Sequence, residues 1–224
     1  FRYNEKLSEQ KRIFLQAFDG YYSGVPNIKE MILEEHTESE ALDLAKNARV
    51  HDLANWPLTN TNDVFKFGNK ITTPVAATWI IGLNATKPPF DKIEVRQAFK
   101  AAINTNEFRN RFYPDAIPAT GYVPFGLSGS GVVAKINPKV SFVPKEKITM
   151  VIPAELAHAN EMKIFFEMPL KALGWKFEVQ VLPWGKLMEG YSKKYHQAFL
   201  VSMNMDYPDA EFLLRNFESS NPDN

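Results

Sequence analysis

Residues 83–99 read LNATKPPFDKIEVRQAF, and a strand, a stiff connector and a helix meet within them. The apolar run 75–83, which leads into this segment, has the nearly continuous hydrophobicity of a strand covered on both faces. The paired prolines within residues 87–91 favour an extended connector. Over residues 95–112 apolar side chains recur at helical spacing and polar ones occupy the other face, which predicts one helix. We therefore expect a new structural unit to begin after residue 84.

Beyond residue 144 predicted strands alternate with predicted helices. The strands are expected at 148–152, 176–182 and 198–203, and the helices at 156–173, 184–192 and 210–217. Such alternation implies a largely parallel sheet with covering helices. Pro169 is expected to kink or divide the first of these helices, because proline removes the hydrogen bond to residue 165. The predicted fold class is α/β, with a mixed, mostly parallel sheet flanked by helices.

The first part of the chain has a different pattern. Strands are expected at 12–18, 28–35 and 50–56, and a helix at 39–48 with Ser39 as its N-cap. Residues 113–144 are rich in proline and glycine, and we expect a long ordered loop there.

Composition excludes several classes of protein. The 26 basic and 26 acidic side chains among 224 residues give no net charge, which argues against a nucleic-acid partner. The absence of cysteine excludes disulfides, thiolate zinc sites and a cysteine nucleophile. None of the four histidines lies in a close ligand pair, so no metal site and no cofactor are expected. The chain starts without a signal-peptide pattern, and we expect it to be an interior piece of a longer protein.

The most informative polar residues are the carboxylates of MDYPDAE, residues 205–211, which follow the predicted strand 198–203. Asp209 precedes a predicted helix and is expected to be its N-cap. Asp206 lies at the carboxyl end of the strand, where open α/β sheets bind ligands. A partly buried carboxylate there suits a cationic ligand group. The alternative is a hydrolase that uses Asp206 with Asp209 or Glu211 as an acid/base pair.

Six stretches, taken in order, resemble the motifs of one family. They are YYSGVP (21–26), LNATKPPFDKIEVRQAF (83–99), AINT (102–105), GYVP (121–124), LKALGWKFEV (170–179) and MDYPDAEFL (205–213). The family is that of the periplasmic oligopeptide- and dipeptide-type solute-binding proteins of ABC importers, extracellular solute-binding protein family 5.

The resemblance implies a bacterial periplasmic protein without catalytic residues that captures peptides between two lobes and delivers them to the ABC permease subunits. The implied fold is a periplasmic-binding-protein type II-like lobe, with a mixed, mostly parallel sheet flanked by helices, plus part of the first lobe. By this resemblance residues 1–84 are a partial segment of the first lobe. Residues 85–224 are the second, ligand-binding lobe, incomplete at its C-terminal end. The missing part of the first lobe, in the same polypeptide, is then an expected partner. The same fold hosts other ligands, so a sugar, a nickel chelate or haem stays an alternative.

The resemblance also implies a set of substrate-binding residues. Asp206 matches the aspartate that holds the α-ammonium group of the peptide, and His158 matches a histidine that contacts its far end. Met203 stands where the family commonly has tryptophan, which implies a more apolar pocket. Asn204 and Tyr207 complete the expected set.

Overall fold

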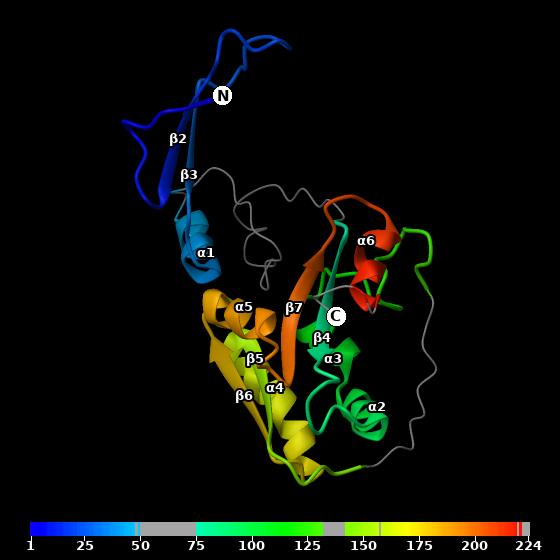
Figure 1. The fold of residues 1–224 in the computed structure, drawn as a ribbon. Coiled ribbons are helices and arrows are strands. Elements are labelled where there is room, and N and C mark those ends of the chain that lie inside the picture. Colours follow the sequence, from blue (N-terminus) through cyan, green and yellow to red (C-terminus); the bar gives the residue numbers. More distant parts are fainter. Residues whose placement is uncertain (48, 50–74, 132–141, 157, 219, 221–224) are drawn as a thin grey trace. The chain divides into compact units, whose positions relative to one another are not determined.

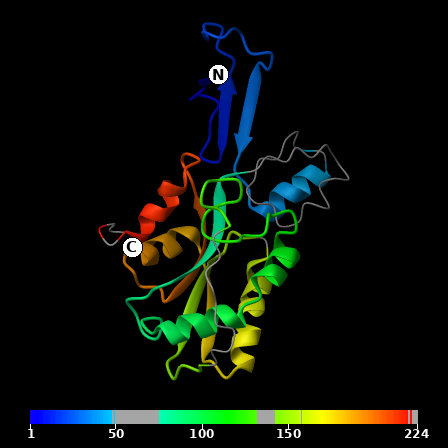
Figure 2. The same cartoon turned by 90° about the vertical axis from the view of Figure 1, so that its right-hand side faces the viewer.

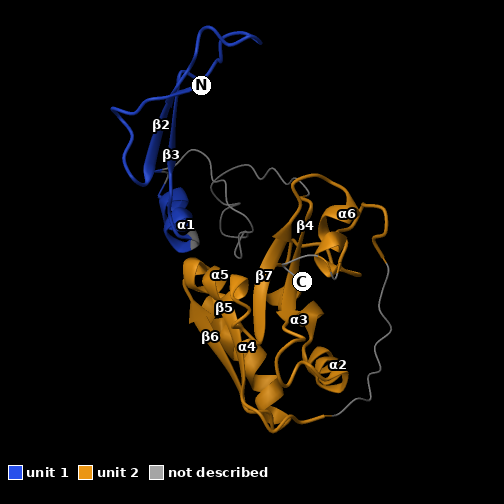
Figure 3. Cartoon of the chain, in the orientation of Figure 1, with its two compact units in different colours: residues 1–53 blue, residues 54–224 orange. Residues whose placement is uncertain are grey.

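The chain forms two compact units, residues 1–53 and 54–224, which are described separately (Figure 3). The structure is a computed structural model, and it describes residues 1–47, 49, 75–131, 142–156, 158–218 and 220. The strand predicted at 50–56 lies outside these residues.

The described part of the first unit contains a small antiparallel sheet and one helix. Strands β1 (Arg2–Tyr3), β2 (Arg12–Gln16) and β3 (Glu30–Glu34) pair in sequence order, and α1 (Glu38–Lys46) follows. The two strands predicted at 12–18 and 28–35 are thus confirmed.

The N-cap predicted for this helix is wrong. Thr37, not Ser39, begins α1, because the Thr37 hydroxyl accepts a hydrogen bond from the Glu40 N–H. The Glu40 carboxylate in turn accepts from the Thr37 N–H. This reciprocal capping box satisfies two backbone donors, whereas Ser39 lies inside the helix.

The second unit is built on a four-stranded sheet (Figure 1). Its strands are β4 (Ala77–Leu83), β5 (Ile148–Pro153), β6 (Phe177–Leu182) and β7 (Ala198–Asn204), in the order β4-β7-β5-β6. Strands β5, β6 and β7 are parallel, and β4 is antiparallel to β7. The predicted mixed, mostly parallel sheet is confirmed.

Helices cover both faces of this sheet (Figure 2). Helices α2 (Ile93–Ala102), α3 (Thr105–Phe112) and α4 (Ala159–Ala172) pack on one face, and α5 (Trp184–Ser192) packs on the other. Successive strand residues serve opposite faces, so Met150 lies under α2–α4 and Val151 under α5. We call the cluster of Val151, Leu187 and Val201 the minor core.

One helix prediction is wrong, and of the kink or division expected at Pro169 the division does not occur. The helix expected over 95–112 is two helices, because the Asn104 side chain accepts from the Glu107 N–H and starts α3. Pro169 does not divide α4, which continues to Ala172. Proline there removes one hydrogen bond close to the end of the helix. Gly174 follows with a φ of 85°, as expected for a helix C-terminus.

The units do not divide where the lobe boundary was expected. β4 lies before residue 84 but pairs with β7 from Ala77↔Asn204 to Leu83↔Ala198, which joins it to the sheet of the second unit. The assignment of residues 1–84 and 85–224 to two lobes stays a prediction. The described residues of 113–144 contain neither helix nor strand, and no helix in the described part of the chain is long and apolar enough to cross a membrane.

Candidate functional site

The candidate site lies where β7 ends. β7 continues past the residue pairs that it shares with β5, and its last residue, Asn204, pairs with Ala77 of β4. The turn 205–209 then leads into α6 (Ala210–Leu214), which a 3₁₀ turn (Arg215–Phe217) extends. Because parallel strands end at the same edge of a sheet, the segment after β5, which contains His158, lies at the same edge as this turn.

Asp206 presents a free carboxylate at this edge. It makes no hydrogen bond or ion pair with the residues that the structure describes, and it is exposed. The sequence pattern favoured a partly buried side chain, so the exposure exceeds the expectation. An exposed, unpaired carboxylate is available to a ligand, but it gains strength only if a ligand or further polypeptide excludes water from it.

The other carboxylates of the turn are engaged within the chain. The Asp209 carboxylate accepts from the Glu211 N–H at 2.9 Å, which confirms the predicted N-cap. One Glu211 oxygen accepts from the Tyr207 hydroxyl at 2.6 Å, and the other lies 3.2 Å from Arg215 Nε. The hydrogen bond to Glu211 raises the pKa of Tyr207, and burial adds to this effect. These contacts hold Tyr207 in place and leave Asp206 without a free second carboxylate beside it in the sequence.

Met203 and Asn204 have different surroundings. Met203 is half-buried and packs against the minor core, so part of its side chain stabilises the fold under α5. Asn204 is exposed, and its side-chain oxygen accepts from the Ser202 hydroxyl at 2.9 Å. Asn204 is therefore the more accessible of the two to a ligand.

His158 occupies the N-cap position of α4 without making a side-chain capping bond. Its Nδ1 lies 3.7 Å from a carboxylate oxygen of Glu161, and its ring centroid lies 6.4 Å from that of Phe112. The His158 ring therefore packs near the Phe112 ring, while about 38% of the His158 side chain stays exposed.

Two hollows in the second unit do not include any of the five predicted residues. One, of about 560 Å³, is lined by residues near the amino-terminal ends of β5 and β6, among them Lys147 and Lys176. The other, of about 490 Å³, includes Thr149, Gln180 and Gln197. The five predicted residues lie instead at or near the opposite, carboxyl edge of the sheet. Among the described residues, no three side chains that bind metals gather in one place.

The residues of the 83–99 segment have structural tasks. The Asn84 amide donates to the carbonyls of Lys194 and His196, and so ties the connector to the turn before β7. The Arg96 guanidinium donates to the carbonyls of Phe90 and Asp91. This segment builds a corner of the fold, away from the carboxyl edge.

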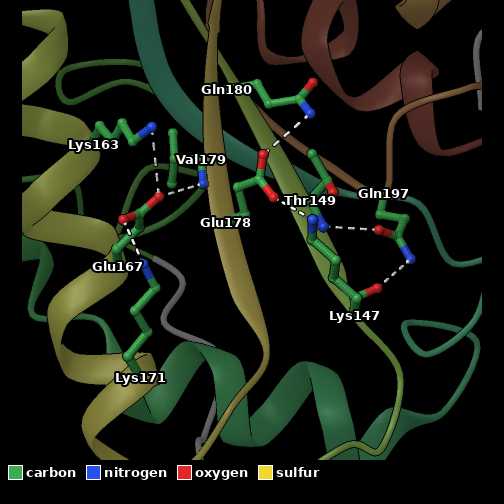
Figure 4. A network of polar contacts seen from close by, with 9 residues as sticks. All are labelled: Lys147, Thr149, Lys163, Glu167, Lys171, Glu178, Val179, Gln180 and Gln197. Atoms are coloured by element: carbon green, nitrogen blue, oxygen red, sulfur yellow. Dashed lines mark hydrogen bonds and ion pairs between the residues drawn. The ribbon is translucent and has the colours of Figure 1, made fainter.

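Two polar residues that the sequence analysis did not single out organise the sheet (Figure 4). Gln197 accepts from the Thr149 N–H and donates to the carbonyl of Pro88. Glu167 accepts from the Val179 N–H and contacts two lysines. Its signal in the sequence is a lysine four residues before it and another four residues after it.

Residues 3–138 match the model of the bacterial extracellular solute-binding proteins, family 5 Middle. No curated protein matches the sequence.

Several solved structures share the fold of this chain. The periplasmic binding protein DppA from Helicobacter pylori, in complex with the peptide STSA, has a TM-score of 0.78 and 14% identity over 96% of this chain and 44% of its own. The oligopeptide-binding protein AppA from Bacillus subtilis, in complex with a nonapeptide, has a TM-score of 0.69 and 18% identity over 94% and 48%. AgaA from A. tumefacien R10, in complex with agropinic acid, has a TM-score of 0.72 and 18% identity over 96% and 47%. The fold is that of periplasmic binding proteins, and the chain spans about half the length of these structures.

Proposed function

The chain belongs to the bacterial extracellular solute-binding proteins of family 5, and on this basis we propose that it forms part of the peptide-binding component of an ABC importer. DppA and AppA are both seen in complex with peptides, which supports the ligand class. DppA is a periplasmic binding protein, which supports a periplasmic location. In this proposal the chain binds its solute without chemical change. It delivers the solute to the permease subunits of the importer.

Asp206 is the residue that we propose for ligand orientation. Its exposed, unpaired carboxylate at the end of β7 is the observation that carries the proposal. A peptide has one α-ammonium group, and a charge-assisted hydrogen bond to it would set the direction of the peptide in the site. His158, at the same edge of the sheet, would contact the far end, with Met203, Asn204 and Tyr207 beside Asp206.

The remainder of the cleft is proposed to come from polypeptide beyond this chain, including the rest of the first lobe. Closure of two lobes over the peptide would exclude water from Asp206 and so strengthen its contact with the ammonium group. Hydrogen bonds between the backbone of the protein and the backbone of the peptide would supply affinity that does not depend on the peptide sequence. The closed, loaded state would be the one that the permease recognises.

A solute other than a peptide is the second candidate. AgaA shares the fold and is seen with agropinic acid, so the fold alone does not select peptides. A carboxylate-dependent hydrolase is less well supported, because Asp209 and Glu211 are occupied in α6.

The test uses the full-length protein and a peptide that co-purifies with it, identified by mass spectrometry. Replacing the carboxylate by Asp206→Ala is expected to weaken binding tenfold or more in calorimetry, since a hydrogen bond to a charged group contributes about 1.5–3 kcal/mol. Asp91→Ala, which removes another exposed aspartate, is the matched control and should bind as the wild type does.

Acetylation of the peptide's amino terminus isolates the interaction. The acetylated peptide should bind the wild type weakly, and Asp206→Ala should then cost little more. Equal affinity of wild type and Asp206→Ala for the free peptide would refute the role of Asp206. A co-purifying molecule that is not a peptide would move the proposal to the second candidate.

A further inference from the structure

In the described part of the chain, strand β6 is the outer strand of its sheet. It pairs there only with β5, so its other side carries backbone groups that no described strand occupies. The Lys176 carbonyl, just before β6, accepts from the Ile148 N–H, and the Leu182 carbonyl, at the end of β6, accepts from the Ala154 N–H. The even-numbered residues of this segment therefore direct their backbone groups toward β5. Alternate residues of a strand direct their N–H groups to opposite sides. The N–H groups of Phe177, Val179 and Val181 therefore face outward, and such an edge is a template for pairing with another chain.

Glu167 of α4 occupies the centre of this edge. One carboxylate oxygen accepts from the Val179 N–H at 2.8 Å (Figure 4). Lys171 Nζ donates to the other oxygen at 2.7 Å, and Lys163 Nζ lies 3.9 Å from the first. Only 12% of the Glu167 side chain is exposed, so little water competes for the Val179 N–H.

The surroundings keep Glu167 charged. Burial acts to raise its pKa, but the hydrogen bonds from Lys171 and Val179 and the charges of Lys171 and Lys163 outweigh burial and hold the pKa below its ordinary value. A charged acceptor binds an N–H more strongly than a neutral one does. The contact is therefore stronger than an ordinary hydrogen bond.

The edge is complementary to a second copy of itself. An antiparallel pair of β6 strands centred on Val179 would place Phe177 opposite Val181 and Glu178 opposite Gln180. Apolar residues would meet apolar ones and polar residues polar ones. The outward N–H and carbonyl of Val179 would bond with those of Val179 in the other copy, which gives the two-fold contact of a symmetric dimer.

We propose that Glu167 closes the β6 edge against strand addition by a second copy of the chain. Its carboxylate takes the central N–H of the edge, and the helix that carries it lies beside the strand. This role does not depend on the ligand of the protein.

The first test is Glu167→Ala against the matched control Glu189→Ala. Glu189 also contacts two lysines, Lys186 and Lys193, but it lies on α5 and accepts no hydrogen bond from a strand. Sedimentation should show dimers of Glu167→Ala at micromolar concentration and none for Glu189→Ala or the wild type. Glu167→Ala leaves Lys163 and Lys171 without this carboxylate, and their charges would repel those of a second copy. The buffer should therefore contain about 0.5 M NaCl, which shortens the range of this repulsion to a few ångströms. Equal sedimentation of all three proteins would overturn the proposal.

The second test is amide hydrogen exchange of dilute, monomeric protein. In the wild type the Val179 amide should exchange at least tenfold more slowly than that of Val181, which faces the same side. Glu167→Gln keeps an oxygen acceptor and should keep most of this protection. Val179 and Val181 exchanging alike in the wild type would contradict the proposal even if Glu167→Ala fails to fold, as would loss of protection in Glu167→Gln.

Discussion

Asn84, Arg96 and Phe90 show what the 83–99 segment does at the scale of single residues. Asn84 and Arg96 satisfy backbone carbonyls, and Phe90 is fully buried. None of them lies in the proposed site. The segment therefore identifies the fold rather than the ligand, and the ligand must be argued from Asp206 and its neighbours.

Gly190 gives a prediction at the same scale. It lies in α5 against the His196 ring, and a Cβ there would stand 2.1 Å from His196 Nε2. The same nitrogen contacts the Leu187 carbonyl at 3.0 Å. Gly190→Ala must displace the ring and weaken that bond, so it should lower the free energy of unfolding by about 1–3 kcal/mol.

Gly185→Ala is the matched control on the same helix. Nothing lies within 4 Å of a Cβ built at Gly185, so only helix propensity changes. This variant should be neutral or more stable by up to about 1 kcal/mol in urea unfolding. If both glycine variants unfold alike, the close approach of His196 has no energetic importance.

At the scale of elements, Glu167 joins α4 to β6 through a group that titrates. Its pKa is lower in the folded chain than its ordinary value of 4.5, so the charged form stabilises the fold. The contribution is complete above pH 4.5 and is lost as the pH falls from there toward the lowered pKa. Acid should therefore loosen the helix from the strand.

Glu167→Gln measures this contribution. At pH 7 the variant should be less stable than the wild type by about 1–2 kcal/mol, because it loses the charge and the lysine contacts. The difference should be smaller at pH 3 than at pH 7, because the pH has then fallen from 4.5 toward the lowered pKa of Glu167 in the wild type. Urea unfolding of both proteins at the two pH values checks it, and a difference that stays constant would assign the effect to packing.

Elements with a strong hydrophobic pattern were predicted well, and elements that depend on local hydrogen bonds were not. Helix α5 has the predicted ends, and β5, β6 and β7 differ from prediction by one residue at one end. The break between α2 and α3 at Asn104 was missed, because the apolar periodicity continues through it. The N-cap at Thr37 was missed, because Ser39 is a second plausible N-cap two residues later. Both features depend on which side-chain oxygen accepts a hydrogen bond from a backbone N–H.

At the scale of the whole molecule, the two units have unequal cores. In the described part of residues 1–53, Leu42 alone is a buried hydrophobic residue, whereas large side chains such as Ile13, Ile32 and Leu33 are exposed. The described part of the second unit instead has a buried apolar cluster on each face of its sheet. A short segment with so little buried apolar surface does not offset its conformational entropy.

Separate expression of the units tests this difference. Residues 54–224 should fold alone and unfold in one cooperative thermal transition followed by circular dichroism. Residues 1–53 alone should show no such transition, since a small sheet with an exposed apolar face is marginal in water. A sharp transition in the isolated 1–53 piece would show that the local pairing of β2 with β3 is enough.

The sequence alone determined the family, the α/β class, the alternation of strands and helices along the chain and the position of Asp206 after a strand. These properties depend on local hydrophobic pattern and on motifs. Tertiary structure alone decided that β4 joins the second unit, that Glu167 meets the edge of β6 and that Asp206 is exposed. Each of these depends on residues far apart in the chain that only folding brings together, and hydrophobic period carries no information on such pairings.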